Sequence, residues 1–458
     1  MKPGVVIVGA GLAGSILAAK LRARYAVTVI ELRDSAVPLP TPIAETGVPP
    51  QLEVHAGAGP GGTTNFWHNG LIEIEDQDYA AWPATKAELE PFVARSLDLL
   101  SGVAQNALAR EDARVRARLV KRGVPNALLG KSLFSPRVHR NIWKHLGLPG
   151  GDVACVTGLA RRFEIANGTT TAVAVETGDG TRRVEGDIFI ASAGGLSSPA
   201  LLSATAERAG LHLPAIGRHY HDHPMTSVGQ MTLSLKLHDA LHHSAPAIRG
   251  ALRIPFVTRV GDTRFAFYLR TQELDRHHAA RSALRELRDN PGVWRNYRKV
   301  LGSGRGVLEV LVFHLGIELP TSTFSIRMVA EQPPDDTLTL SGRPDGSIVR
   351  NWTLAPDFPR QVEEALRKLL DTLGSHVVHF AADPNWQKQL QTAAHHSGGC
   401  RMANGPEQGV CDRDLRVFGT DNLYVCDGSA LPSSGYANTG LMIGAIALRL
   451  ADHLIART

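Results

Sequence analysis

Cysteine is scarce in this chain. Four thiols occur in 458 residues, at Cys155, Cys400, Cys411 and Cys426, and none has the CxxC or other spacing of a metal-binding set. This pattern excludes a disulfide-based scaffold and a cysteine metal centre. It favours reduced thiols in a cytosolic protein.

Long apolar runs are also missing. No stretch of eighteen apolar residues occurs, so no membrane span is expected. The opening MKPGVVIVGAGLAGSILAA has the basic-then-apolar character of a signal peptide, but its glycines fall in a nucleotide-binding pattern and no cleavage site precedes a mature domain. We therefore expect a cytoplasmic protein without a membrane partner.

Aromatic residues make up 6% of the chain, and the net charge of +5 comes from scattered basic residues. The densest basic run lies between Arg281 and Arg305, and we interpret it as a solvated helical face. A nucleic-acid surface needs aromatic residues interleaved with a basic stripe. We find no such stripe, so no nucleic-acid partner is expected.

The residues that are abundant indicate a globular α/β protein. Apolar residues account for 43% of the sequence, 45 residues are glycine, and the length allows two to four domains. No internal repeat appears.

The first motif is a dinucleotide fingerprint. Val5 to Val8 form a continuous apolar run, as a buried parallel strand requires. A GxGxxG turn and a helical pattern follow, and a second strand, Val27 to Ile30, ends at an acidic residue suited to a ribose hydroxyl. These residues predict a bound dinucleotide, NAD or FAD: Gly9, Gly11, Leu12, Ala13, Gly14 and Glu31.

A glycine-rich stretch, residues 57–70, follows a proline-rich loop. Its backbone amides suit an anion or an aromatic ring, although a flexible loop explains the composition equally well. Three amphipathic helical stretches are then expected at residues 85–100, 106–121 and 131–146.

The middle of the chain contains predicted strands, then a histidine-rich segment, and then a unit of mixed strands and helices. A hairpin turn is expected at residues 178–180, a buried strand at 187–193, and a histidine-rich segment, GRHYHDHP, covers residues 217–224. Metal ligation by these histidines is the less favoured interpretation because no further ligand cluster accompanies them. Residues 225–394 look like a separate α+β unit, with strands at 227–236, 264–270, 308–318, 324–331 and 337–341 and helices at 280–301 and 357–374.

The last sixty residues return to dinucleotide-domain patterning. Leu423 to Cys426 form a strand that ends at an Asp-Gly turn, and Leu441 to Ile455 form an apolar helix. His395 and Asn438 flank this unit. On its own, His395 is more often a structural residue than a catalytic one.

Taken together, these blocks resemble the glucose–methanol–choline (GMC) oxidoreductases. The resemblance rests on VVIVGAGLAGS with Glu31, GPGGTTNFW, AGGLSSPALL, GRHYHDHP, EQPPDDTLTL and the C-terminal segment, in that order. It implies a doubly wound, Rossmann-like α/β domain that binds FAD and is discontinuous in sequence, plus an α+β substrate domain built on an antiparallel sheet. The implied division is residues 1–84, 151–224 and 395–458 for the FAD domain, 85–150 for a helical cap or linking segment, and 225–394 for the substrate domain.

The resemblance also implies site residues. His395 matches the family's catalytic histidine and Asn438 its polar partner. An imidazole can take the hydroxyl proton of an alcohol, and an amide can hydrogen-bond the oxygen as charge develops. The residues expected to bind the cofactor are Gly9, Gly11, Leu12, Ala13, Gly14, Glu31, Gly62, Thr63, Asn65, Val156, Asp427, Gly428, Asn438 and Thr439.

Several positions depart from the family pattern. His396 replaces a proline, so either histidine of the pair could face the flavin, and we favour His395. Thr439 also stands where the family has proline. Phe66 occupies the position at which some members attach FAD covalently, so we expect noncovalent FAD, with His68 as the other candidate attachment site.

The function that follows is FAD-dependent oxidation of a primary or secondary alcohol, with hydride transfer to flavin N5 and O2 or another compound as electron acceptor. The hydroxyl could belong to a sugar, a polyol or a natural product. The alternatives are a hydroxynitrile-type lyase without net redox, a light-driven fatty-acid decarboxylase and a redox-inactive FAD-binding scaffold.

Overall fold

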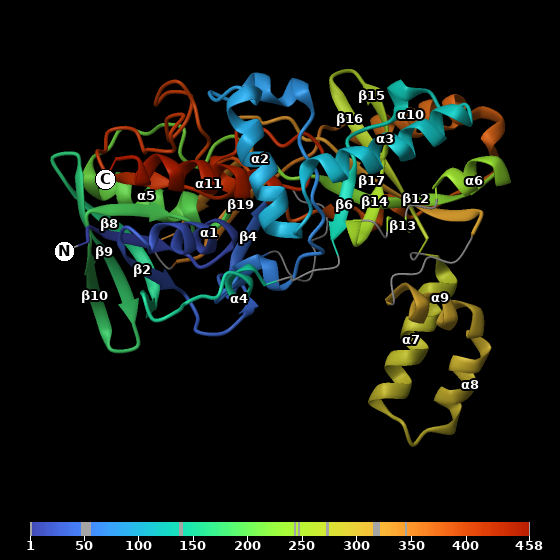
Figure 1. Cartoon of the computed structure of the whole chain (residues 1–458), viewed down its shortest axis with the longest axis horizontal. Coiled ribbons are helices and arrows are strands. Elements are labelled where there is room, and N and C mark those ends of the chain that lie inside the picture. The colour runs from blue at the N-terminus through green and yellow to red at the C-terminus, as the bar shows by residue number, and fades with distance from the viewer. Residues whose placement is uncertain are drawn as a thin grey trace.

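Two main sheets lie along the long axis of the molecule (Figure 1). The computed structural model describes residues 2–46, 56–136, 141–241, 244–245, 248–271, 274–314, 321–343 and 346–457. The protein is a mixed α/β protein, with a parallel sheet beside the two termini and an antiparallel sheet towards the other end. None of the helices within these ranges is long and apolar enough to cross a bilayer.

The parallel sheet has five strands in the order β22-β11-β1-β2-β7. Three separate parts of the chain supply them, and all neighbours pair in parallel. The apolar run Val5 to Val8 is buried throughout, as expected for a central strand. The strands are β1 (Gly4–Val8), β2 (Ala26–Glu31), β7 (Val153–Thr157), β11 (Ile188–Ala191) and β22 (Leu423–Val425).

Helices cover this sheet. The apolar helix α11 (Gly440–Ile455) packs against α1 (Leu12–Leu21) and α2 (Lys86–Ser101), while α5 (Ser197–Ala209) packs on β8. A second, three-stranded sheet consists of β8 (Leu159–Ala166), β9 (Thr169–Thr177) and β10 (Gly180–Glu185). The β9–β10 hairpin confirms the turn predicted at residues 178–180.

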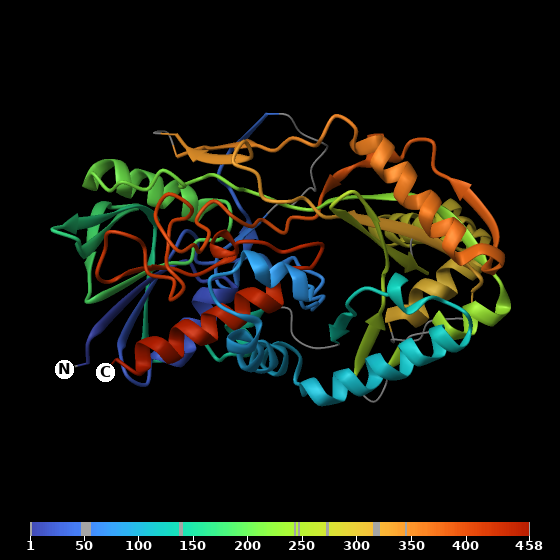
Figure 2. The same cartoon turned by 90° about the horizontal axis from the view of Figure 1, so that it is seen from above.

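The antiparallel sheet belongs to the other half of the molecule. Its order is β15-β16-β17-β12-β20, with β21 paired to the start of β12. Helix α10 packs against β15, and α3 runs from the parallel-sheet half towards this sheet and contacts α6 (Figure 2). The bounds are β12 (Pro224–Leu233), β15 (Phe256–Val260), β16 (Thr263–Arg270), β17 (Thr323–Ala330), β20 (Val377–Ala382), β21 (Gln391–Thr392), α3 (Gln105–Lys121), α6 (Leu235–Leu241) and α10 (Phe358–Leu373).

Short strands form three further small sheets. Their members are β3 (Val37–Pro38), β4 (Ile43–Thr46), β5 (Gly57–Ala58), β6 (Leu133–Pro136), β13 (Ser244–Ala245), β14 (Gly250–Arg253), β18 (Thr339–Gly342) and β19 (Ile348–Asn351). The parallel pair β4–β19 connects the N-terminal segment to the segment between β17 and β20 of the antiparallel sheet.

Three predicted elements are wrong. The helix expected at 131–146 is strand β6 followed by the short helix α4 (Ile142–His145), because β6 pairs with β14. The strand expected at 308–318 is helix α9 (Gly304–His314), and residues 315–320 lie outside the described ranges. A short continuous apolar run does not distinguish a strand from a helix. The helix expected at 280–301 is two helices, α7 (Asp275–Asp289) and α8 (Trp294–Gly302), separated at Pro291-Gly292.

Candidate active site

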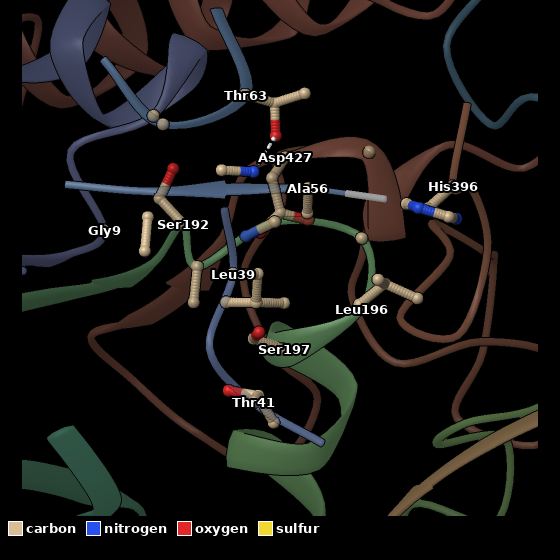
Figure 3. Close-up of a pocket in the computed structure, with 18 of the residues that line it drawn as sticks. Gly9, Leu39, Thr41, Ala56, Thr63, Ser192, Leu196, Ser197, His396 and Asp427 are labelled. Atoms are coloured by element: carbon tan, nitrogen blue, oxygen red, sulfur yellow. Dashed lines mark hydrogen bonds between the residues drawn. The ribbon is translucent and has the colours of Figure 1, made fainter. Parts of the chain in front are cut away.

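A cavity of about 620 Å³ lies where three distant chain segments converge. The strands β1, β11 and β22 are parallel, so their carboxyl ends meet at one edge of the sheet, where α/β proteins bind ligands. Gly9, Ser192 and Asp427 follow these strands and line the cavity together (Figure 3). The Asp427 carboxylate accepts a hydrogen bond of 2.8 Å from the backbone N–H of Gly194, which ties two of the turns together.

The turn after β1 has the shape that the glycine motif predicts. Gly9 has a φ of 106°, which glycine tolerates, and a Cβ on Gly14 would overlap the Gly9 carbonyl. A Cβ on Gly11 would meet no atom within 4 Å, and Gly11 lines the cavity at the N-cap of α1. No side chain caps this helix, so its first N–H groups suit a phosphate.

Glu31 lies beside this turn, at the end of β2. Its carboxylate accepts hydrogen bonds from the backbone N–H groups of Ala10 (2.7 Å), Leu32 (2.8 Å) and Gly59 (3.1 Å). Since each carboxylate oxygen accepts about two hydrogen bonds, one acceptor position is left for a ribose hydroxyl. The Glu31 carboxylate therefore stabilises the turn and is also a candidate ligand-binding group.

Most of the residues predicted to bind the cofactor line this cavity: Gly9, Gly11, Leu12, Ala13, Glu31, Gly62, Thr63, Asp427, Gly428, Asn438 and Thr439. The open space over Gly11, the uncapped helix and the acceptor on Glu31 fit the ADP half of FAD. Phe66 and His68, the positions considered for covalent attachment, line the cavity too.

Three predicted residues lie elsewhere. Gly14 sits behind the turn, where it allows α1 to approach β1. The Asn65 side chain donates hydrogen bonds to the carbonyls of Pro60 and Gly62 and so holds its own loop. Val156 is buried in β7, and the neighbouring residues 158–161 line the cavity instead.

His395 lines the cavity, and its ring makes no hydrogen bond to the residues that the structure describes. Burial lowers the pKa of His395 to about 4, which leaves the imidazole neutral at pH 7. The backbone N–H of His395 donates to Asp222 at 3.0 Å, and the preceding residue, Ala394, has a left-handed φ of 57°. The backbone of His395 is therefore fixed while its ring remains available to a ligand.

His396 is held more tightly than its neighbour. Its carbonyl lies so close to Gly195 and Gly428 that a Cβ on either glycine would overlap it. Its Nδ1 is 2.8 Å from the Tyr220 hydroxyl and 3.3 Å from an Asp222 carboxylate oxygen. Figure 3 shows the His396 ring at the side of the cavity away from Gly9.

Asp222 connects the two histidines. It is fully buried, and burial opposes its ionisation. The hydrogen bond from His396 and the nearby imidazoles outweigh burial and hold the pKa of this carboxyl well below its usual range. The Asp222 carboxylate therefore holds the ring of His396 and the backbone of His395.

His223 also lies at the site, next to His395, although no sequence motif indicated it. Its ring meets the His395 ring edge-on, with centroids 5.3 Å apart, and its Nε2–H donates to the carbonyl of Ala437 at 3.0 Å. Burial lowers the pKa of His223 to about 4, so this ring is neutral as well. His223 thus links His395 to the residue before Asn438. His223 lies in the GRHYHDHP segment, but the residue spacing of that segment did not indicate a contact with His395.

Asn438 reaches the cavity from the turn before α11. A Cβ on Gly70 would lie 3.0 Å from the Asn438 amide nitrogen, so glycine at position 70 preserves the room for this side chain. His395 and Asn438, 43 positions apart in sequence, therefore line the same cavity.

The chain is similar to known oxidoreductases in sequence and in fold. Residues 337–447 match the GMC oxidoreductase family model. The 2-methyl-1,2-propanediol dehydrogenase of Mycolicibacterium austroafricanum is 26% identical over 64% of this chain and 52% of its own length, so the match spans about half of that relative. Among solved structures, pyridoxine 4-oxidase from Mesorbium loti has a TM-score of 0.63 at 16% identity and covers 99% of both chains. A formate oxidase of Aspergillus oryzae RIB40, studied for modification of its FAD, has a TM-score of 0.65 at 15% identity, over 100% of this chain and 98% of its own.

The chain carries the C-terminal region of a GMC oxidoreductase at residues 337–447, which is the family that its sequence motifs indicated. It is a flavoprotein whose cofactor is FAD, consistent with the fit of the cavity described above.

Proposed function

We propose that this protein oxidises a primary or secondary alcohol to a carbonyl compound, with His395 as the general base. The observation that carries the proposal is the position of the His395 ring. It is neutral, makes no hydrogen bond to the described residues, and lines the same cavity as Asn438 and the nucleotide-binding turn.

The two side chains suit different parts of the reaction. The neutral imidazole of His395 accepts the hydroxyl proton, a role that contributes about 10²–10⁴-fold to the rate of typical enzymes. The Asn438 amide donates a hydrogen bond to the substrate oxygen as negative charge develops on it. A flavin bound in this cavity would supply the acceptor for the hydride of the substrate carbon.

Asp222 and His223 act as positioning residues in this proposal. Asp222 accepts the backbone N–H of both His223 (2.6 Å) and His395 (3.0 Å), and His223 packs its ring edge against His395. These contacts limit the orientations of the base, which general-base catalysis requires.

We also propose that FAD is held without a covalent bond, since Phe66 has no nucleophilic atom. The substrate class remains a primary or secondary hydroxyl of a sugar, a polyol or a natural product. The related diol dehydrogenase and pyridoxine oxidase make 1,2-diols and pyridoxine sensible first compounds to test.

The test is anaerobic mixing of the yellow holoprotein with a panel of alcohols, diols, pyridoxine and sugars. We expect at least one compound to bleach the flavin and yield one carbonyl product per flavin reduced. Rapid return of colour in air identifies O2 as the acceptor, whereas slow return indicates another acceptor. Carbonyl formation without bleaching would support the lyase alternative and overturn the proposal. Acid precipitation of the same preparation should leave FAD in the supernatant.

A further inference from the structure

Helices α7, α8 and α9 project from the antiparallel half, away from the rest of the molecule (Figure 1). Ten large hydrophobic side chains are exposed in the described part of the chain, and six of them belong to residues 293–311. They are Val293, Trp294, Tyr297, Leu301, Leu308 and Leu311. Trp294 is 71% exposed and Leu301 is 75% exposed, so these side chains face solvent rather than a core.

Helix α8 packs with its polar side inward. Asn296 is buried, and its amide donates hydrogen bonds to the carbonyls of Glu286 and Asn290, both at 3.0 Å. Successive helical residues are about 100° apart, so Trp294, Tyr297 and Leu301 form a stripe on the opposite side. The helix is therefore amphipathic, and its apolar stripe points away from the protein.

This projecting unit is also strongly basic. Residues 275–314 contain eight arginine or lysine residues and four acidic ones, and this excess of +4 accounts for most of the net charge of the chain, +5. Glu286, Asp289 and Glu309 neutralise four of the basic residues. Within the described ranges, the remaining four form no ion pair: Arg281, Arg285, Arg295 and Arg298.

We propose that α8 and the adjoining part of α9 dock on an anionic lipid membrane surface. Tryptophan and tyrosine favour the interface between headgroups and acyl chains, and leucine favours the acyl boundary. Arg295 and Arg298 lie on α8 itself, where they can pair with lipid phosphates. A second copy of this chain is a poorer occupant, because it would bring two sets of unneutralised arginines together. The proposal is independent of the alcohol-oxidising function.

Vesicle sedimentation with the FAD-loaded protein tests this surface. Vesicles of phosphatidylglycerol mixed with phosphatidylcholine should bind the protein, and high salt should weaken the binding. The double variant Trp294→Ser/Leu301→Ser should bind at least about tenfold more weakly, since it removes two exposed apolar groups. The variant Arg295→Gln/Arg298→Gln should lose most of the difference between anionic and pure phosphatidylcholine vesicles.

The matched control is Leu235→Ser/Val378→Ser. These residues are 75% and 66% exposed on other elements, so their loss should leave vesicle binding unchanged. Equal binding by the Trp294→Ser/Leu301→Ser variant and wild type overturns the proposal. Absence of vesicle binding by the wild type overturns it as well. So does a Trp294→Ser/Leu301→Ser variant that loses self-association or polyanion binding but still binds vesicles. Retained flavin absorbance in every variant shows that the fold is intact.

Discussion

The cavity has two kinds of wall, one from each half of the molecule. On the parallel-sheet side the lining includes the glycine-containing turns that follow β1, β11 and β22. On the antiparallel side the histidines come from the ends of two paired strands. His223 precedes β12 and His395 follows β21, and the pairing of Pro224 with Thr392 brings them together. Cofactor binding thus depends on backbone shape, and the proposed chemistry depends on side chains fixed by strand pairing.

The difference shows where each half is sensitive to change. In the turns of the parallel-sheet side, an added Cβ weakens ligand binding when it fills the space that the ligand needs. Among the buried side chains of the other side, a substitution is harmful when it removes a charge or a hydrogen bond. Substitutions in the two halves should therefore affect different measurements.

The largest effect is expected at the junction of the halves. Arg264 in β16 is buried and forms ion pairs with Asp78 and Glu331, including a hydrogen bond of 2.7 Å from its Nε to Glu331. Arg264→Ala leaves the buried carboxylate of Asp78 and the half-buried carboxylate of Glu331 without their partner, and it should reduce the free energy of unfolding by about 3–5 kcal/mol. Urea unfolding measures this change. The exposed Arg259→Ala in β15 is the matched control, with an expected change of about 0.5 kcal/mol or less. Similar losses of unfolding free energy in Arg264→Ala and Arg259→Ala would contradict the claim that the ion pairs of Arg264 stabilise the fold.

The next effect concerns pH and the buried histidines. Burial lowers the pKa of His221, His223 and His395 to about 4 in the folded protein. The unfolded value is about 6.5, so the unfolded state binds more protons between these values and stability falls as the pH drops from about 6.5 to about 4. A single fully buried histidine contributes on the order of 3 kcal/mol to this loss.

A pair of variants isolates that contribution. Unfolding free energies at about pH 7 and about pH 5 should differ less in His223→Gln than in wild type, because one proton-binding site of the unfolded state is gone. His212→Gln is the control, since His212 is exposed. An unchanged pH dependence in His223→Gln would show that this ring does not resist protonation.

A smaller effect separates two glycines of the same motif. Gly11→Val places its side chain in the open space of the cavity, so FAD should bind about 100-fold more weakly while the apoprotein stays stable. In Gly14→Ala the new methyl overlaps the Gly9 carbonyl, and the apoprotein should lose about 1–3 kcal/mol. Flavin titration and urea unfolding of both variants check this contrast. Wild-type FAD affinity in Gly11→Val would contradict the assignment of this turn.

Local sequence patterns predicted the parallel half well. The β1 turn, strand β22 and helix α11 were all expected near their observed bounds, because burial on both faces and glycine turns leave short-range signals. Helix α9 and strand β6 were predicted wrongly, since pairing and packing partners far away in sequence decide them.

The candidate site was predictable only in part. His395 and Asn438 followed from the family resemblance, and both line the cavity. The roles of Asp222 and His223 depend on the pairing of β12 with β21, which no local pattern encodes. The exposed apolar stripe of α8 was not predicted for a similar reason. Sequence periodicity identifies the apolar face of a helix, but tertiary packing determines whether that face is buried or exposed.

The central claim is that His395, rather than His396, is the base. The anaerobic rate of flavin reduction by an accepted alcohol should be measured in His395→Gln and His396→Gln, each with FAD bound. We predict a loss of about 10²–10⁴-fold in His395→Gln and of less than about tenfold in His396→Gln, whose ring is engaged by Tyr220 and Asp222. Near wild-type reduction in His395→Gln, with the large loss in His396→Gln, would contradict the account.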